Sequence, residues 1–143
     1  MSIPLQTLRD LQSPFYRVGV KAMVFDDVRR LLVIYGKRGF PELPGGGWEH
    51  GETLEACLQR ELQEEIGVRA KTISPIRFTF QAQTIRGWYA LRLVVEVQLE
   101  SLDFTFGDGM TAAKFVTKEE FLRLSYDDPA DAAITACAEQ IWN

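Results

Sequence analysis

Apolar residues recur along this chain mostly in short runs, with one longer stretch of helical period. Residues 15–25 are rich in Val, Phe and Tyr, and residues 31–35 form a second apolar run beyond the polar segment 26–30. Two such runs around a short polar turn predict a β-hairpin. Residues 36–47 follow with five glycines and two prolines, a composition that predicts a loop.

Residues 53–66 carry the clearest helical pattern of the chain. Leu54, Leu58 and Leu62 recur every four positions, so they share one side of a helix, which we expect to face the core. Gly67 is well placed to end this helix, because glycine readily adopts the left-handed conformation of a C-cap. On the same projection, the opposite and solvent-facing side carries Gln59, Arg60 and Gln63.

The second half of the chain returns to a β pattern. The expected elements are strands at 76–83, 88–98 and 112–116, a short helix opened by a capping box at 117–120, and a C-terminal helix at 129–142. In total we expect about six strands and three helices, with the central helix between two groups of strands. This order predicts an α+β or layered α/β domain with a mixed sheet.

Length and composition agree with a single globular domain over residues 1–143. Hydrophobic residues make up 46% and charged residues 25% of the chain, as in ordinary globular proteins. No apolar run approaches ~18 residues, and the N-terminus has no basic start before an apolar block, so we expect neither a membrane span nor a signal peptide. Cys57 and Cys137 are expected to be buried free thiols, which favours a cytoplasmic protein.

The negative charge of the chain is concentrated in one segment. The net charge is −4, which disfavours general binding of nucleic acids. Residues 46–68 hold six of the 20 acidic residues but only one of the 16 basic residues. This concentration of negative charge raises the question of whether the segment binds a cation.

Three glutamates lie beside the apolar stripe of the central helix. Glu61 and Glu65 fall within about 20° of the direction of Leu54, and Glu64 flanks them. Like charges at this spacing repel, and a partly buried carboxylate must either bind a proton or find a cation. A divalent metal satisfies this need, and hard oxygen ligands favour Mg²⁺ or Mn²⁺. The alternative is a crowded acidic patch that is simply solvated.

The three glycines 45–47 stand directly before this helix. Glycine lets the backbone approach a ligand closely, although three glycines can also form a plain flexible turn. Next to the carboxylates they make a plausible platform for a metal and a phosphate. The implied chemistry is metal-assisted substitution at phosphorus.

These residues resemble the Nudix hydrolase family. The box of that family reads Gly-x5-Glu-x7-Arg-Glu-U-x-Glu-Glu-x-Gly-U, where U is a bulky aliphatic residue. Its nine defined positions are matched by Gly46, Glu52, Arg60, Glu61, Leu62, Glu64, Glu65, Gly67 and Val68. The box covers residues 46–68, and the preceding Leu-Pro-Gly-Gly also looks like the family.

The resemblance implies a fold, a reaction and a set of roles. The fold would be an α/β/α sandwich with a central mixed sheet. The reaction would be Mg²⁺-dependent (or Mn²⁺-dependent) hydrolysis of a pyrophosphate bond in a nucleoside diphosphate linked to another group, such as a nucleoside triphosphate or a nucleotide sugar. The implied metal ligands are Glu61, Glu64, Glu65 and the carbonyl of Gly45, with one glutamate as general base. Arg60 and Glu52 would form the charged pair that orients these carboxylates.

Candidates for substrate binding are less specific. Lys37 and Arg38, just before the box, are expected phosphate contacts, and Arg86 and Arg92 are weaker candidates. Gly46 would let the backbone approach the substrate. Aromatic residues that would stack on a base are Phe40, Trp48, Trp88 and Tyr89. For all of these side chains, solvated or packing roles are the alternative.

Downstream of the box, the sequence departs from several patterns of the family. The proline and tyrosine that mark ADP-ribose and dinucleoside-polyphosphate hydrolases are absent around residues 83–86. Many members also carry an acidic residue near the start of the strand before the short helix, where residues 111–115 have none. Asp108 is the nearest acidic residue, and Glu96 lies on the preceding predicted strand.

Two other functions compete with hydrolysis. Isopentenyl-diphosphate isomerase shares the fold, but it uses Cys and His chemistry, and neither cysteine here lies in a suitable loop. A non-catalytic Nudix-like sensor would bind a nucleotide, yet such domains usually lose box carboxylates that this chain keeps. We therefore expect a small-molecule nucleotide as partner. Exposed aromatic residues near Trp88 and Trp142 would allow a homodimer.

Overall fold

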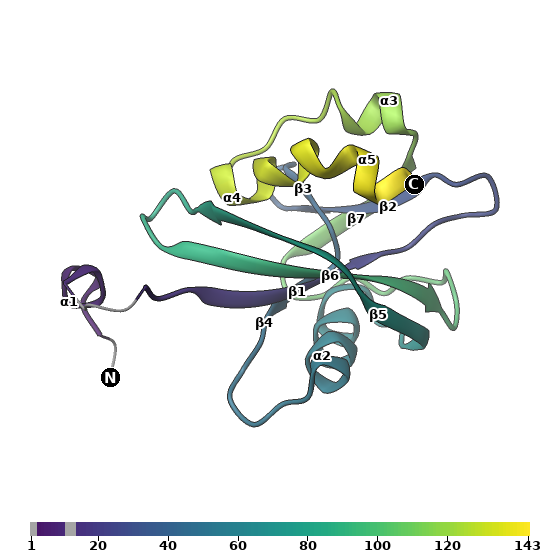
Figure 1. Cartoon of the computed structure of the whole chain (residues 1–143). Helices are drawn as coiled ribbons and strands as arrows, with labels where there is room; N and C mark the ends of the chain where they lie inside the picture. Colours follow the sequence, from purple (N-terminus) through teal and green to yellow (C-terminus); the bar gives the residue numbers. More distant parts are fainter. Residues whose placement is uncertain (1–2, 11–13) are drawn as a thin grey trace.

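The computed structural model describes residues 3–10 and 14–143. Its strands form two sheets, shown in Figure 1. One sheet has the order β4-β1-β6-β5 and consists of β1 (Arg17–Met23), β4 (Gly45–Gly47), β5 (Ala70–Gln83) and β6 (Tyr89–Leu99). The other has the order β3-β2-β7 and consists of β2 (Leu31–Gly36), β3 (Pro41–Glu42) and β7 (Met110–Val116). Strands β1 and β6 are parallel and their other neighbours are antiparallel, so the larger sheet is mixed.

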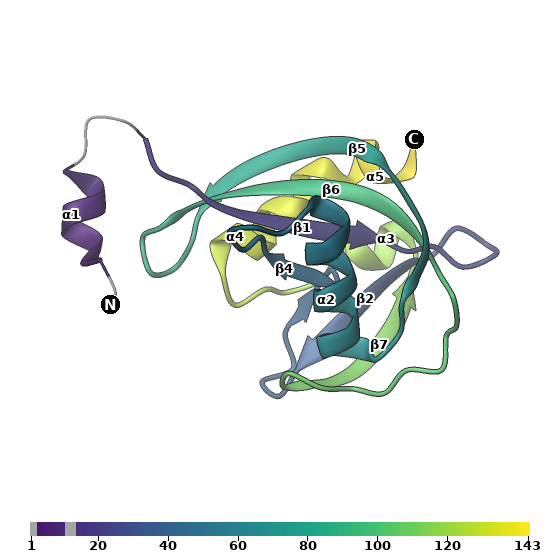
Figure 2. The ribbon, with the colours of Figure 1, turned by 90° about the horizontal axis from the view of Figure 1, so that it is seen from below.

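Helices cover the sheets from two sides. The helical segments are α1 (Leu5–Arg9), α2 (Leu54–Ile66), α3 (Lys118–Phe121), α4 (Pro129–Ala132), a 3₁₀ segment η1 (Ala133–Cys137) and α5 (Ala138–Trp142). Helix α2 lies on one side and α3, α4 and α5 lie on the other, as Figures 1 and 2 show. The predicted α/β sandwich with a central mixed sheet is therefore confirmed. Within the described residues, no helix has the length and apolar character needed to cross a bilayer.

The central strands bury side chains on both faces. Leu58 and Leu62 of α2 pack in one core with Val95 of β6, while Val94 packs in a second core with Phe121 of α3. Successive residues of a strand point to opposite faces, so one strand supplies both cores. A sheet covered on both faces explains why its strands read as continuous apolar runs. Both cysteines are buried and free, as predicted.

A hairpin was predicted for residues 15–25 and 31–35, but the two segments pair with each other only next to the connecting turn. The amide of Leu32 donates to the carbonyl of Val24 (2.8 Å), and Phe25 and Leu31 form an antiparallel bridge. Beyond the turn, β1 joins β4 and β6, whereas β2 joins β3 and β7. The hairpin prediction was wrong over most of its length, because the longest pairings of the two strands, β1 with β6 and β2 with β7, join them to distant parts of the sequence.

Three other predicted elements need correction. The expected loop 36–47 contains β3 and β4, so the glycine triplet is an edge strand rather than a free turn. Strand β5 begins at Ala70 instead of residue 76 and is bent by irregular register. The C-terminal helix is interrupted by η1. Helix α1, which the apolar pattern did not predict, lies apart from the sheets in Figures 1 and 2.

Both ends of α2 follow the local sequence. The amide of Ala56 donates to the Thr53 hydroxyl (3.1 Å), and Gly67 ends the helix in the left-handed region with φ 68°. The loop after β6 then joins this end, because the amides of Thr105 and Gly107 donate to the carbonyls of Ile66 (2.9 Å) and Glu65 (3.1 Å). These bonds hold the loop before β7 against the helix.

Replacing Gly67 by alanine should destabilise the protein by more than backbone strain alone. A Cβ at Gly67 would lie 2.9 Å from the carbonyl oxygen of Thr105, in addition to requiring a positive φ. We expect Gly67→Ala to lower the free energy of unfolding by about 2–4 kcal/mol, measured by urea denaturation. Gly51→Ala is the matched control, because Gly51 has φ 85° but no atom within 4 Å of the added Cβ. Equal losses in the two variants would show that the Thr105 contact does not matter.

Candidate metal centre

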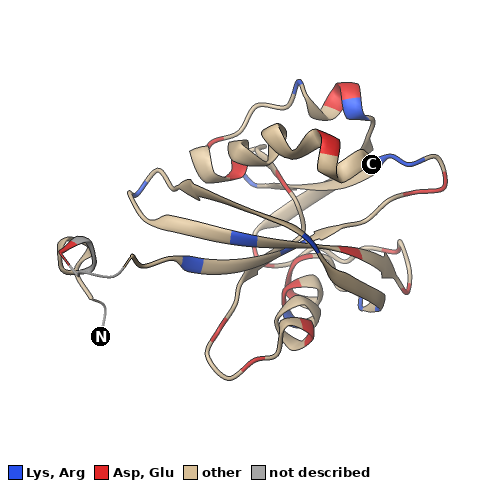
Figure 3. Ribbon diagram, viewed as in Figure 1, with Lys and Arg blue, Asp and Glu red and all other residues tan. Residues whose placement is uncertain are grey.

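Helix α2 carries the predicted carboxylates where the apolar stripe meets the surface. Glu65 is 3% exposed and Glu61 is 9% exposed, whereas Glu64 is open to solvent. Figure 3 shows the acidic positions along α2 and in the loop before it. The placement of Glu61 and Glu65 toward the core, expected from the helical projection, is therefore confirmed.

The same projection was wrong for Gln59 and Arg60, which were expected to face solvent. Both are half-buried. The Gln59 amide group donates to the carbonyl of Ala70 (3.0 Å) and accepts from its amide (2.9 Å), which ties α2 to β5. A projection gives the direction of a side chain, but it does not show which distant segment covers it.

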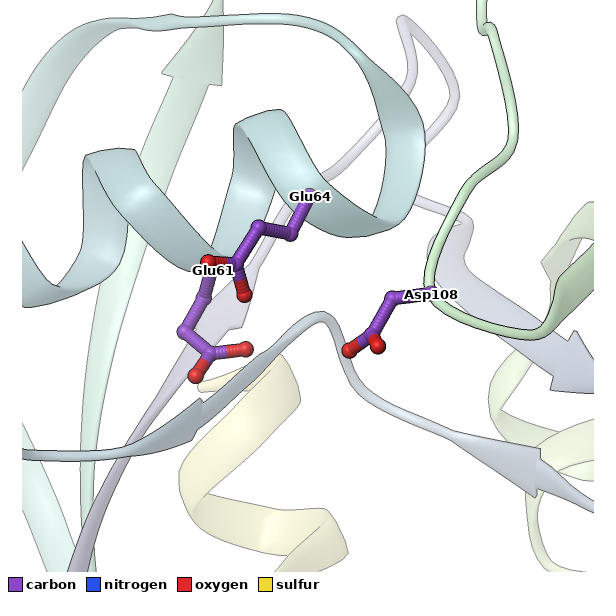
Figure 4. Close-up of side chains that lie close together, drawn as sticks. All are labelled: Glu61, Glu64 and Asp108. Atoms are coloured by element: carbon purple, nitrogen blue, oxygen red, sulfur yellow. The ribbon is translucent and has the colours of Figure 1, made fainter.

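Two of the glutamates meet an aspartate from another part of the chain. One carboxylate oxygen from each of Glu61, Glu64 and Asp108 lies within 4.8 Å of the other two, and Figure 4 shows the three side chains converging. Magnesium and calcium ions bind oxygen ligands at about 2.0–2.6 Å. Oxygens at this mutual separation fit around one such ion, so the three residues are suited to hold a hard divalent cation.

The backbone around Asp108 is held in an uncommon conformation. Asp108 has φ 50°, and Gly109 after it has φ 79°. Few residues other than glycine adopt this region, and they remain there when the surroundings fix them. A Cβ on Gly107 would lie 2.5 Å from the carbonyl oxygen of Glu64, so the loop also needs a glycine to approach α2. The loop thus brings Asp108 to the helix.

Arg60 links the acidic residues to one another. Its guanidinium makes a two-pronged ion pair with Glu52, with Nε–Oε2 at 2.7 Å and Nη2–Oε1 at 3.0 Å. It also donates to Glu61 (2.8 Å), to Glu64 (3.4 Å) and to the carbonyl of Gly47 (2.9 Å). The Arg60 hydrogen bond lowers the pKa of Glu52 to about 2. The ion pair of Arg60 and Glu52 that the sequence predicts is present. Arg60 also contacts Glu61 and Glu64, two residues of the acidic cluster.

Glu65 has different partners from the other glutamates. One of its carboxylate oxygens accepts from the amide of Gly45 (2.7 Å). On the other side of this segment, the buried ammonium of Lys21 donates to the carbonyls of Leu43 and Gly45, both at 3.1 Å. Burial raises the pKa of Glu65 to about 8, and the nearby Lys21 charge opposes this shift. Glu65, an expected metal ligand, is not part of the cluster of Glu61, Glu64 and Asp108. The carbonyl of Gly45, the other ligand expected in this segment, accepts from Lys21.

Gly46 and Cys57 shape the space around the cluster. A Cβ on Gly46 would lie 2.5 Å from the carboxyl carbon of Glu61, so this glycine lets the strand pass beneath the carboxylate. The thiol of Cys57 lies under the same strand and donates to the carbonyl of Gly47 (3.5 Å). Burial raises the pKa of Cys57 to about 11.

An open pocket of about 1,060 Å³ reaches from Glu61 over Trp48 to Tyr16. The indole of Trp48 donates to the carbonyl of Glu52 (2.9 Å) and packs against the core. Tyr89 stands 52% exposed at the start of β6 and contacts Tyr16 edge to face, with ring centroids 6.3 Å apart. These two predicted substrate contacts thus lie in or next to the pocket.

Lys37 and Arg38 lie elsewhere. Both are exposed on the turn after β2, and neither lines the pocket. The guanidinium of Arg38 forms an ion pair with Asp127 (2.7 Å). The sequence pattern did not indicate Lys21, and Asp108 was only the acidic residue nearest to residues 111–115. The local signal for Asp108 was its position between two glycines, a pattern that indicates a tight turn without showing what the turn contacts.

A family model described as NUDIX domain matches residues 15–136. The nucleoside triphosphatase NudI of Enterobacter sp. (strain 638) is 29% identical over 102 residues, which cover 65% of this chain and 72% of that protein.

Solved structures share the fold. The MutT protein of Methanosarcina mazei Go1 matches with a TM-score of 0.76 and 19% identity, over 92% of this chain and 96% of that chain. The ORF135 protein of E. coli matches with a TM-score of 0.72 and 24% identity, over 91% of each chain. A NUDIX hydrolase from Nitrosomonas europaea matches with a TM-score of 0.72 and 21% identity, over 88% of each chain.

Gly46→Ala should displace the Glu61 carboxylate while the fold is kept, because the atoms that the new Cβ meets are the end of a flexible side chain. We expect the variant to bind Mn²⁺ about 10-fold more weakly or worse, measured by the electron paramagnetic resonance signal of free Mn²⁺. Gly47→Ala is the control, since nothing lies within 4 Å of a Cβ there. Equal Mn²⁺ affinities in both variants would contradict a role for the Glu61 position.

The raised pKa of Glu65 predicts a pH-dependent stability in protein without divalent cations. The pKa of Glu65 is about 8 in the folded protein, against an ordinary value of 4.5, so the folded chain holds an extra proton between these two pH values. The stabilising contribution of this proton is complete below about pH 4.5 and is lost as the pH rises through 8. Glu65→Gln removes this loss, so its stability relative to the parent protein should increase from pH 5 to pH 8.5. Urea denaturation in EDTA measures this, and parallel pH profiles would refute it.

Proposed function

Since this chain belongs to the Nudix hydrolase family, we propose that it hydrolyses a pyrophosphate bond in a nucleoside diphosphate linked to another group, with Mg²⁺ or Mn²⁺ as cofactor. The family acts on small-molecule nucleotides. The observation that carries the proposal is the convergence of Glu61, Glu64 and Asp108 next to an open pocket. An acidic site of this kind attracts a phosphate only when a cation is bound.

The residues of the centre have separable tasks in this proposal. Glu61, Glu64 and Asp108 would hold the divalent cation. Once bound, such a cation lowers the pKa of a coordinated water and neutralises charge on phosphoryl oxygens. Arg60 fixes the directions of the Glu61 and Glu64 carboxylates through its hydrogen bonds. Glu64 and Asp108 are the members open to solvent, so they are placed to accept a proton from an attacking water.

Related proteins suggest which substrates to test first. The relative from Enterobacter is named a nucleoside triphosphatase, and one structural neighbour from E. coli is a dihydroneopterin triphosphate pyrophosphohydrolase. We therefore place triphosphates at the head of the panel. Nucleotide sugars, ADP-ribose, dinucleoside polyphosphates and capped RNA complete it.

Location and assembly remain predictions. A cytoplasmic location is supported by the two free, buried cysteines. For a homodimer, Tyr16 and Tyr89 offer exposed aromatic surface near Trp88. Trp142 offers less, since its ring packs on Phe121 with ring centroids 5.3 Å apart.

The proposal is tested by a Mg²⁺-dependent hydrolysis screen over this panel. We expect Glu64→Gln and Asp108→Asn to fold and to lower turnover by about 100-fold or more, because each removes a charged ligand that stabilises the transition state. Glu55→Gln on α2 and Asp103→Asn in the loop before β7 are matched controls, since both residues are exposed and outside the cluster.

Two results would contradict the proposal. Near-normal turnover by Glu64→Gln would refute the role of the cluster. Measured Mn²⁺ binding without hydrolysis of any panel member would favour the alternative of a nucleotide-binding sensor domain.

A further inference from the structure

A second groove lies next to the metal centre and is lined by arginines. It has a volume of about 310 Å³, and its lining includes Arg17, Arg86, Arg92, Trp88 and Gly47. We call it the arginine groove. Arg17 and Gly47 also line the pocket that reaches Glu61, so the groove continues that pocket past strand β4.

Gly47 lines the arginine groove, and Gly19 lies beneath the side chain of Arg92, one of the arginines of the groove. Gly47 of β4 pairs with Gly19 of β1, and Gly19 pairs with Arg92 of β6, so the three positions form one row across the sheet. A Cβ on Gly19 would lie 2.6 Å from Nη1 of Arg92. The guanidinium of Arg92 therefore lies over Gly19 and extends toward β4, the strand that passes beneath Glu61.

The face of the sheet can be assigned from the alternation of side chains. Val94 packs in the core opposite α2, and Arg92 is two positions earlier on the same strand. Residues two apart share a face, so Arg92 lies on the side away from α2. A ligand that contacts both Glu61 and Arg92 must pass around the short edge strand β4. Neighbouring strands are about 4.8 Å apart, so β4 and β6 are separated by about 10 Å.

Among the described residues, the arginines of the groove form no close ion pair. In residues 3–10 and 14–143, none of Arg17, Arg86 and Arg92 has a carboxylate oxygen within 4.0 Å, whereas ion pairs engage Arg29, Arg30, Arg38, Arg60 and Arg77. Basic positions on the neighbouring strands β1 and β6 are visible in Figure 3.

The carboxylates closest to the groove are directed elsewhere. Asp128 lines it, but its Oδ1 accepts from the amides of Ile85 (3.2 Å) and Ala130 (2.9 Å). Asp131 lies with Arg92 at a separate small cavity, where burial raises the pKa of Asp131 and the charges of Lys21 and Arg92 oppose this rise. The arginines are therefore free to bind an external anion.

We propose that the arginine groove binds a phosphate group of the substrate that lies outside the bond being hydrolysed, and that Arg92 determines the preference for substrates with such a phosphate. The inference rests on the proposed function and narrows its substrate class to nucleotides with a phosphate beyond the cleaved pyrophosphate, such as nucleoside triphosphates. Guanidinium groups match phosphate oxygens in a two-pronged geometry, which favours phosphate over a neutral sugar. Arg17 is held for this task by Trp88, with its guanidinium carbon 5.5 Å from the ring centroid.

The first test measures binding without turnover. Inorganic tripolyphosphate is titrated calorimetrically into the protein in EDTA. We expect Arg92→Met to weaken binding about 10-fold or more, as expected for loss of a charge-assisted hydrogen bond, and Arg92→Lys to weaken it less. Arg123→Met is the control, because Arg123 is exposed, lies outside the groove and changes the net charge equally. Gly19→Ala should act like Arg92→Met, since it displaces the guanidinium without removing its charge.

The second test compares substrates. With Mg²⁺, Arg92→Met should raise the KM for a nucleoside triphosphate about 10-fold, with kcat and the KM for a nucleoside diphosphate sugar little changed. Unchanged tripolyphosphate binding, or equal losses in Arg92→Met and Arg123→Met, would overturn the inference. So would equal losses for both substrates.

The two proposals fail in different ways. Arg92-dependent binding of tripolyphosphate without hydrolysis of any substrate would support the groove and contradict the hydrolase. Hydrolysis that is independent of Arg92 would contradict the groove alone. Thermal unfolding of each variant shows whether it is folded when these measurements are made.

Discussion

The acidic centre depends on how one guanidinium is shared. Helix α2 and the loop before it place Glu52, Glu61 and Glu64 around Arg60, and like charges at such spacing repel. The five donors of a guanidinium are fixed in a planar fork, so a single side chain can satisfy several carboxylates in defined directions. One more donor bond, to the carbonyl of Gly47, ties this fork to strand β4. The Arg60 guanidinium therefore both compensates the charges of the glutamates and holds strand β4 in position.

The three glycines of β4 differ in which atoms lie close to their backbone. Gly45 has φ 126°, and a Cβ there would collide with the carbonyl of Val20 on β1. Gly46 leaves room for Glu61, whereas a Cβ on Gly47 would meet no atom within 4 Å. Gly45 and Gly46 thus meet different needs, one toward β1 and one toward Glu61.

Local sequence was sufficient for the central helix but not for its surroundings. Thr53 and Gly67 act through their own backbone neighbours, so both ends of α2 could be predicted. The inward placement of Glu61 and Glu65 followed from the helical period. The approach of Asp108 could not be predicted, because it depends on hydrogen bonds between a distant loop and the end of α2. Likewise, Arg92 was only a weak candidate, since its position over Gly19 requires the parallel pairing of strands from opposite halves of the chain.

The buried thiol of Cys57, beneath β4, affects which metal ions the acidic centre prefers. Thiolates, rather than thiols, coordinate metals, and soft ions such as Cu(I) and Zn²⁺ favour them over carboxylates. Cys57 sits close to the acidic centre, yet its raised pKa keeps it protonated and its S–H is directed at a carbonyl. The fold therefore places a sulfur beside the site without offering it as a ligand. Copper or zinc arriving at Glu61, Glu64 and Asp108 would meet carboxylate oxygens instead of a thiolate, which removes the advantage those metals have at cysteine-containing sites.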